Sequence, residues 1–328
     1  MKICIYGAGA VGSNFATRLA MAGEDVCAIA RGPHLDAIKQ NGLKLIVGDE
    51  TFQTYLKATH DPTEVGIQDV VIITLKGPSL TGIVDSIKAL ISDETTIIFA
   101  MNGIPWWYFY GIDEPAKERR IEVLDPGSRW WNEIGPERAV GGVVYSANMI
   151  VEPGVVRNSS VSRNLLRIGE PDKSISERCK RINFALDRAG LAVPVAEDIR
   201  KEIWNKLLSN IAFSPICTLT SSPLSEVLSN PELKSLCIKI MEEVIAIADS
   251  LGIKIDIDIE DRIASAKNIG AHKPSMLQDL EHQRPMEIHS ILSVPQEFGK
   301  MNGLLTPNID TMIALLKHRA SSAGLFSK

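Results

Sequence analysis

Residues 2–12 read Lys2-Ile3-Cys4-Ile5-Tyr6-Gly7-Ala8-Gly9-Ala10-Val11-Gly12, a short apolar strand that runs directly into Gly-x-Gly-x-x-Gly. In this pattern the first glycine allows a tight turn and the second lets a pyrophosphate approach the backbone. The third lets the next helix pack closely on the strand. A helix-like stretch (13–22) and a second strand (25–30) complete a βαβ unit. A phosphate-binding turn is therefore predicted at Gly7, Ala8, Gly9, Ala10, Val11 and Gly12; a glycine-rich turn without a ligand is the alternative.

The residue after the second predicted strand indicates which dinucleotide is bound. NAD sites usually carry Asp or Glu there, which accepts a hydrogen bond from the ribose 2′-hydroxyl. This chain has Arg31 at that position, followed by Gly32. Because a cation suits a 2′-phosphate, the sequence predicts NADP(H) as the cofactor; an exposed arginine at a strand end is the alternative.

Length and composition are those of a globular protein with two domains. The chain has 328 residues, 45% of them hydrophobic and 23% charged, with a formal net charge of −5. This charge argues against nucleic acid or an anionic membrane surface as the main partner. The sequence contains no apolar run long enough to span a bilayer, and its first apolar run, which stops at Gly7, is too short for a signal peptide.

Cysteine and histidine are distributed without the spacing of a disulfide framework or a metal site. The five cysteines are an odd number at irregular positions, which indicates reduced thiols and a cytoplasmic protein. The six histidines show no metal-ligand spacing, so no bound metal is expected. No Ser/His/Asp arrangement typical of a hydrolase stands out.

Further along the chain, strands and helices alternate and then give way to helices alone. Strands are predicted at 69–75 and 95–100 around a helix at 80–91, followed by strand-like runs (142–146, 154–156, 165–169, 191–195) and a helix (176–189). Helical periodicity then continues through 198–213, 231–251, 258–269, 275–281, 285–300 and 306–319. The predicted fold is an α/β Rossmann-type doubly wound domain (1–196) followed by an all-α C-terminal domain (197–328). In a doubly wound sheet, ligands bind at the carboxyl ends of the strands. Gly7, Arg31, Lys76 and Asn102 all follow predicted strands.

The segment 104–138 is irregular and holds four of the five tryptophans: Trp106, Trp107, Trp130 and Trp131. It could form a lid or wall beside a substrate. It could equally form a small satellite core under a long loop.

The first helix of the second domain carries a polar row. Lys206, Asn210 and Ser214 are spaced by four and therefore share one face. A lysine that is partly desolvated can have a lowered pKa and donate a proton near neutral pH. The spacing alone also suits an ordinary solvated lysine.

Taken together, these stretches resemble the 2-dehydropantoate 2-reductase (ketopantoate reductase) family. The matching segments run in family order over nearly the whole chain: the glycine motif, Arg31, Leu75-Lys76, Asn102-Gly103, Glu202-Ile203-Trp204-Asn205-Lys206-Leu207, Asn210, Pro215, Ser275-Met276-Leu277-Gln278-Asp279 and Glu287-Ile288. The resemblance implies a cytoplasmic, NADPH-dependent oxidoreductase that converts 2-dehydropantoate to (R)-pantoate in pantothenate biosynthesis.

The resemblance also implies roles for individual residues. Lys206 would be the general acid that protonates the ketone oxygen, and Asn102 would sit between cofactor and substrate. Glu287 would bind at the active site, and Lys76 would lie near the cofactor. The residues expected to bind the substrate are Lys206, Asn210, Ser214 and Ser275. Because the proposed acid and the cofactor motif fall in different domains, the substrate is expected between them.

Several departures from the family pattern lie on this substrate side. Ser214 replaces a usual Asn, His289 replaces an Asp, and Ser290-Ile291-Leu292-Ser293 replaces Tyr-Ile-Asn-Gly. Pro295 is expected to remove a hydrogen bond from the helix that contains it and to kink that helix. Two alternatives therefore stay open: a reductase of a different 2-oxo acid, and a non-catalytic NADP-binding sensor. The helical domain could also pack against a second copy, which leaves a homodimer open.

Overall fold

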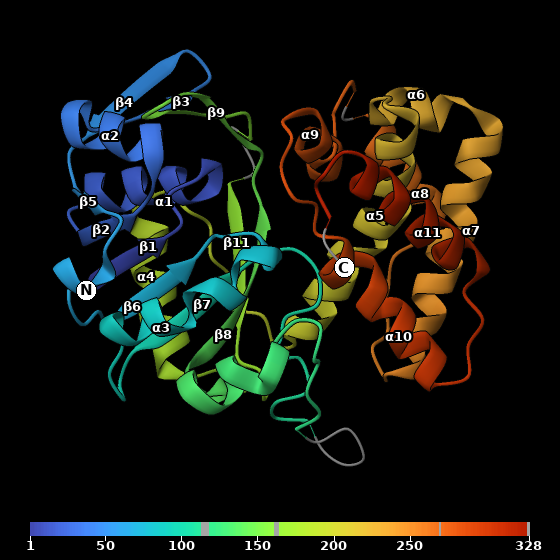
Figure 1. Ribbon diagram of the computed structural model, residues 1–328, viewed down its shortest axis with the longest axis horizontal. Helices are drawn as coiled ribbons and strands as arrows, with labels where there is room; N and C mark the ends of the chain where they lie inside the picture. Colours follow the sequence, from blue (N-terminus) through green and yellow to red (C-terminus); the bar gives the residue numbers. More distant parts are fainter. Residues whose placement is uncertain (113–117, 161–163, 269, 327–328) are drawn as a thin grey trace. The chain divides into compact units, whose positions relative to one another are not determined.

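A computed structural model describes residues 1–112, 118–160, 164–268 and 270–326. The chain divides into two compact units, one of Met1–Met101 with Pro105–Ile199 and one of Asn102–Ile104 with Arg200–Lys328. The first is an α/β unit and the second is helical (Figure 1), which confirms the predicted fold class. The boundary at 196/197 and the roles given to the two domains stay predictions.

The α/β unit is built on a seven-stranded sheet. Its strands are β1 (Lys2–Tyr6), β2 (Asp25–Ile29), β5 (Lys57–Thr59), β6 (Val70–Ile73), β7 (Thr96–Ala100), β8 (Ala139–Tyr145) and β11 (Leu165–Gly169). They lie in the order β11-β8-β7-β6-β1-β2-β5, and all neighbours are parallel except β11 with β8. Numbered by sequence, the parallel strands give 3-2-1-4-5-6, the doubly wound order whose ligand edge lies at the strand carboxyl ends.

A second, four-stranded sheet covers helix α1 (Ala10–Met21). Its strands are β3 (Leu43–Val47), β4 (Glu50–Thr54), β9 (Asn148–Glu152) and β10 (Val155–Asn158), in the order β4-β3-β10-β9. Helix α1 contacts β1 and β2 on one side and strands of the small sheet on the other (Figure 1). This arrangement buries most of α1 and fixes its N-terminus at the ligand edge of the large sheet. The described part of this unit also contains the α-helices α2 (Gly32–Asn41), α3 (Val84–Ile87) and α4 (Glu177–Arg188).

Two of the secondary-structure predictions for this unit are wrong. The helix expected at 80–91 is reduced to the four residues of α3 between 3₁₀ turns. Gly82 lies inside this range and contributes to the change, since glycine weakens a helix. The strand expected at 191–195 makes only isolated bridges, Leu165 with Ala192 and Ile168 with Val195.

The aromatic segment is a satellite core rather than an exposed lid, as far as its described residues show. Trp106, Trp107 and Trp130 are each at most 1% exposed. The rings of Trp106 and Trp130 stack at 5.8 Å, and Phe99 of β7 contacts both edge-on. The Trp130 indole donates a hydrogen bond to the Leu80 carbonyl at 3.1 Å. Residues 113–117 of this segment lie outside the described residues.

The helical unit packs around α7 (Pro231–Ser250). Its other helices are α5 (Ile199–Thr220), α6 (Leu224–Ser229), α8 (Ile259–Lys267), α9 (Ser275–Glu281), α10 (Val294–Met301) and α11 (Pro307–Ser322). Helix α7 contacts α6, α10 and α11. Its Glu243 carboxylate accepts hydrogen bonds from the backbone N–H groups of Asn308 and Ile309 and so caps α11.

Prolines shape two of these helices in different ways. Helix α5 runs past Pro215 to Thr220, although the sequence predicted that it ends near residue 213. Ahead of Pro295, which is the second residue of α10, the chain forms a π-helical turn at His289–Ser293, called the π-turn below. There the Val294 N–H donates to the His289 carbonyl, five residues back. The helical backbone continues through Pro295 into α10, and the kink expected there stays a prediction. The turn ahead of it is π-helical because proline removes an N–H from the ladder.

Candidate functional site

The glycine-rich turn between β1 and α1 leaves no space for side chains at two positions. Gly7 has φ +100°, and a Cβ there would lie 2.6 Å from Cδ2 of Leu75. A Cβ on Gly12 would lie 2.4 Å from the Gly7 carbonyl oxygen and 2.5 Å from Oγ1 of Thr74. Thr74 in turn donates a hydrogen bond to that carbonyl at 2.6 Å. The first and third glycines of the motif are therefore required by the packing of the turn itself.

Gly9 differs, because its α-carbon faces open space. The nearest atom to a Cβ at Gly9 would be the Gly7 carbonyl oxygen, at 3.9 Å. Gly9 is the N-cap of α1, where no side chain caps the helix and no acidic residue stands in the first turn. Uncapped N–H groups and the positive end of a helix dipole bind phosphate. The turn thus fits the pyrophosphate of a dinucleotide.

Arg31 and Lys76 follow strands on the same edge of the sheet. β2 and β6 flank β1 in parallel, so their carboxyl ends lie beside the glycine-rich turn. Arg31 is exposed and has extended backbone just before α2, while Lys76 is partly buried just after β6. The position of Arg31 suits a ribose 2′-phosphate. The binding roles of both residues stay predictions.

The sequence reasoning missed a histidine that supports this turn. The Gly154 N–H donates to Nδ1 of His34 at 3.1 Å, which leaves the ring proton on Nε2. Nε2 lies 3.0 Å from Oγ of Ser13, and that hydroxyl donates to the Ala8 carbonyl at 3.1 Å. Burial lowers the His34 pKa, which favours the neutral ring that this chain of hydrogen bonds needs. No sequence spacing links residues 34 and 154, so only the fold could reveal this chain.

In the helical unit, Lys206 of α5 is partly buried near the carboxylate of Glu287. Desolvation lowers the Lys206 pKa, and the negative charge of Glu287 raises it; the result is a pKa of about 8, against an ordinary 10.5. Glu287 is only 5% exposed and precedes the π-turn by two residues. A buried carboxylate beside a desolvated ammonium is the arrangement expected of a tuned acid.

Asn102 joins this pair from a distant part of the sequence. Its side-chain amide donates a hydrogen bond of 3.1 Å to Oε2 of Glu287. Two residues later, the Ile104 N–H donates to the Ser290 carbonyl at 2.8 Å. Between them Gly103 has φ +84°, and a Cβ there would lie 2.5 Å from the backbone of Ser290. The π-turn therefore holds Asn102–Ile104 in place and orients the Asn102 amide toward Glu287.

The other predicted substrate residues lie in the same helical unit. Asn210 and Ser214 continue the polar row of α5, with Asn210 partly exposed and Ser214 buried. The Ser214 carbonyl accepts a hydrogen bond from the Thr218 hydroxyl at 2.7 Å. Ser275 is the exposed first residue of α9. Their roles toward a substrate stay predictions.

Two polar atoms near these residues were not identified from the sequence as functional. Oδ1 of Asn205 and Oγ of Ser290 are buried and have no hydrogen-bond partner among the described residues. Asn205 precedes Lys206, and Ser290 is the π-turn residue that holds Asn102–Ile104. Buried polar atoms without a protein partner are sites for water or ligand. The signal for Ser290 was its departure from the family pattern.

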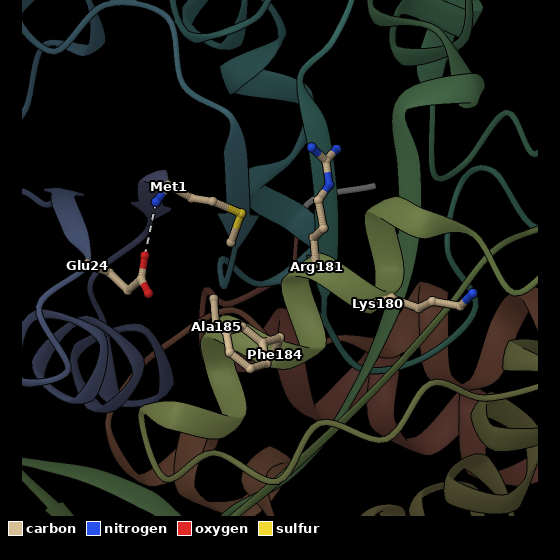
Figure 2. A pocket seen from close by; sticks show the side chains of 6 residues that line it. All are labelled: Met1, Glu24, Lys180, Arg181, Phe184 and Ala185. Carbon is tan, nitrogen blue, oxygen red and sulfur yellow. Dashed lines mark hydrogen bonds and ion pairs between the residues drawn. The ribbon is translucent and has the colours of Figure 1, made fainter.

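A surface pocket in the α/β unit has a volume of about 400 Å³, and none of its lining residues is a predicted site residue. In it the N-terminal ammonium pairs with Glu24 at 3.0 Å, and Figure 2 shows the side chains that line it. Within the described ranges, no cluster of three His, Cys, Asp or Glu side chains could hold a metal ion. Over the same ranges, no helix is long and apolar enough to cross a membrane.

Comparison with known proteins decides the family. Residues 3–172 match the model for ketopantoate reductase PanE/ApbA, and residues 198–320 match the model for ketopantoate reductase PanE/ApbA C terminal. The chain belongs to the ketopantoate reductase family. The resemblance inferred from the sequence is thereby confirmed.

Individual relatives of the ketopantoate reductase family match over the full length. A 2-dehydropantoate 2-reductase of Mesorhizobium japonicum is 42% identical over 328 residues, which is 100% of both chains. Another from Pyrococcus horikoshii is 31% identical over 99% of both chains. The crystal structure of a candidate ketopantoate reductase from Ralstonia solanacearum MolK2 is 36% identical and superposes with a TM-score of 0.92, covering 99% of both chains.

Proposed function

We propose that this chain is an NADPH-dependent reductase of a 2-oxo acid, and that its substrate is 2-dehydropantoate, reduced to (R)-pantoate in pantothenate biosynthesis. The full-length relatives bear the name of that activity. The single observation that carries the chemistry is Lys206, whose pKa of about 8 is set by desolvation against the charge of Glu287.

Lys206 is the proton donor in this proposal. When bound, NADPH supplies the hydride that the carbonyl carbon accepts. The ammonium of Lys206 places positive charge where negative charge develops on the ketone oxygen and then donates its proton there. With a pKa of about 8, Lys206 is mostly protonated at neutral pH and still acidic enough to transfer the proton readily.

Glu287 and Asn102 tune and position this acid. The Glu287 carboxylate keeps the Lys206 pKa from falling further, so that the ammonium persists at neutral pH. Asn102 donates to Oε2 of Glu287 and so fixes the orientation of the carboxylate. Asn102 would also contact cofactor and substrate, while Asn210, Ser214 and Ser275 would hold the substrate.

The α/β unit supplies the cofactor site. Gly7, Ala8, Gly9, Ala10, Val11 and Gly12 would hold the pyrophosphate at the N-terminus of α1. Arg31 would pair with the 2′-phosphate, and Lys76 would lie near the cofactor. The open face of Gly9 and the uncapped helix support this assignment.

A steady-state assay of NADPH oxidation tests the function. The purified protein is mixed with 2-dehydropantoate and NADPH, with NADH in a parallel series and other 2-oxo acids as competing substrates. We expect the largest kcat/KM with NADPH and 2-dehydropantoate. A larger value with NADH would contradict the role of Arg31, and NADPH binding without turnover would favour the sensor.

A different 2-oxo acid is the second candidate. It is favoured by Ser214 and the π-turn, where this chain departs from the family pattern beside the residues that hold Asn102. An equal or larger kcat/KM on another 2-oxo acid in the same assay would select it.

We further propose a cytoplasmic location and leave a homodimer as the state to be tested. Five buried free cysteines among the described residues agree with a reducing compartment. Sedimentation at two protein concentrations distinguishes a monomer from a dimer.

A further inference from the structure

A second cavity, of about 430 Å³, lies in the helical unit outside the residues proposed for catalysis. It is lined by His289, Lys317, His318, Ser321 and Phe326. One of these residues is a lysine, two are histidines, one is a serine with a hydroxyl, and one is a phenylalanine with an apolar ring. None of the lining residues is acidic. The cavity therefore offers positive charge and hydrogen-bond donors beside an aromatic wall.

His289 enters this cavity from a different element than the other residues. It is the first residue of the π-turn, while Lys317, His318 and Ser321 stand on α11. Basic residues in the last turn of a helix are expected from its dipole alone. His289 cannot be explained in that way, because it is not part of α11. Its presence brings a hydrogen-bonding ring to the cavity from a second element.

Two of the lining residues lack partners that such groups normally have. Nδ1 of His289 is buried and has no hydrogen-bond partner among the described residues. Lys317 forms no ion pair with any described residue, and its Nζ lies 5.9 Å from the centre of the Phe326 ring. The His289 and Phe326 rings are 5.3 Å apart. Phe326 is thus adjacent to both polar groups.

The two polar groups also influence each other. Burial and the positive charge of Lys317 both lower the His289 pKa. An anion placed near both side chains would offset this repulsion.

We propose that this cavity binds a small organic anion, with its carboxylate or phosphate group held by Lys317 and His289 and its apolar part against Phe326. The ring excludes water on one side of the charge pair, which strengthens the attraction. None of the residues that line the site is assigned to proton transfer or cofactor binding. The π-turn that contains His289 also holds Asn102–Ile104, because the Ser290 carbonyl accepts a hydrogen bond from the Ile104 N–H. A ligand in the cavity would therefore contact the same turn that positions the Asn102 amide.

Isothermal titration calorimetry on the full chain tests the site. Benzoate and phenyl phosphate serve as the carboxylate and phosphate probes, and acetate and inorganic phosphate carry the same charged groups without the ring. We expect at least one aromatic probe to bind at least about tenfold more tightly than its ring-free counterpart, because only the aromatic probes contact Phe326. The better aromatic probe identifies the preferred group. No binding of either aromatic probe would overturn the proposal.

Variants locate the binding. Lys317→Gln should weaken the better probe by at least about tenfold, since it removes a charge-assisted hydrogen bond. Lys300→Gln is the matched control, because Lys300 is an exposed lysine on α10 outside the cavity, and we expect its affinity within twofold of the parent. His289→Asp places a carboxylate opposite Lys317 and should abolish binding even if Lys317→Gln fails to fold. Unchanged affinity in either cavity variant would place the probe elsewhere and refute the site.

Discussion

The lowered pKa of Lys206 makes a specific prediction about the pH dependence of the reaction. A change from 10.5 to about 8 corresponds to roughly 3 kcal/mol of free energy against the charged form. If Lys206 must be protonated, roughly nine tenths of the enzyme is active at pH 7 and roughly one tenth at pH 9. We therefore expect kcat/KM for 2-oxo acid reduction to fall about tenfold over this range.

The Glu287→Gln variant provides a second test, for which the direction of the change in the Lys206 pKa is predicted. The Glu287 charge raises the Lys206 pKa, so its removal should lower that pKa below about 8 and move the alkaline limb of the profile to lower pH. Glutamine keeps an oxygen that can accept from the Asn102 amide. The assay is NADPH oxidation at saturating cofactor from pH 6 to 10, for parent and variant. A profile that stays flat to pH 9.5, or a limb that moves to higher pH in the variant, would refute the assignment.

Three further predictions concern the cofactor site and the stability of the fold. Gly9→Ala should keep the parent melting temperature but weaken NADPH binding by about tenfold or more. Gly12→Ala should lower the free energy of unfolding by about 2 kcal/mol or more, because its Cβ meets the Gly7 carbonyl at 2.4 Å. Equal stability of the two variants in thermal denaturation would contradict the packing described. Arg31→Ala should raise KM for NADPH about tenfold and leave KM for NADH within about twofold, since only NADPH carries the 2′-phosphate; equal changes for both cofactors would remove Arg31 from this role. Lys206→Met should increase the free energy of unfolding by about 1–2 kcal/mol at pH 7, less than the full pKa shift implies because the side chain is partly exposed. Since the pKa of Lys206 is lower in the folded state, this gain in stability is complete below pH 8 and disappears as pH rises toward 10.5. Urea titrations at pH 7 and 10.5 measure the gain. An equal gain at both pH values would show that the lysine charge is not its source.

The sequence was most informative where local pattern alone determines structure. The strand, the glycine turn and α1 follow from residues 2–22, because turn geometry and helix packing leave few alternatives there. The small second sheet was only partly predicted, since strands such as β4 are half-exposed and lack a strong apolar pattern. The extension of α5 past Pro215 was missed because tertiary packing stabilises a helix that proline disfavours locally.

The candidate site was likewise predicted only in part from the sequence. The spacing of Lys206, Asn210 and Ser214 placed them on one helix face, yet no spacing could show that Lys206 is desolvated. The hydrogen bond between Asn102 and Glu287 joins residues 185 positions apart and depends on the π-turn that holds Asn102–Ile104. Such contacts come from the assembled fold, and the family resemblance anticipated the residues without their geometry.

The central claim is that the Lys206 ammonium donates the proton to the substrate ketone. A crystal structure of the protein with NADP⁺ and a non-reacting 2-oxo acid analogue tests it most directly, through the distance from Lys206 Nζ to the 2-oxo oxygen. The account predicts a distance of about 2.6–3.2 Å, with Glu287 still bonded to the Asn102 amide. A distance beyond about 5 Å with a different donor at the ketone oxygen would contradict it.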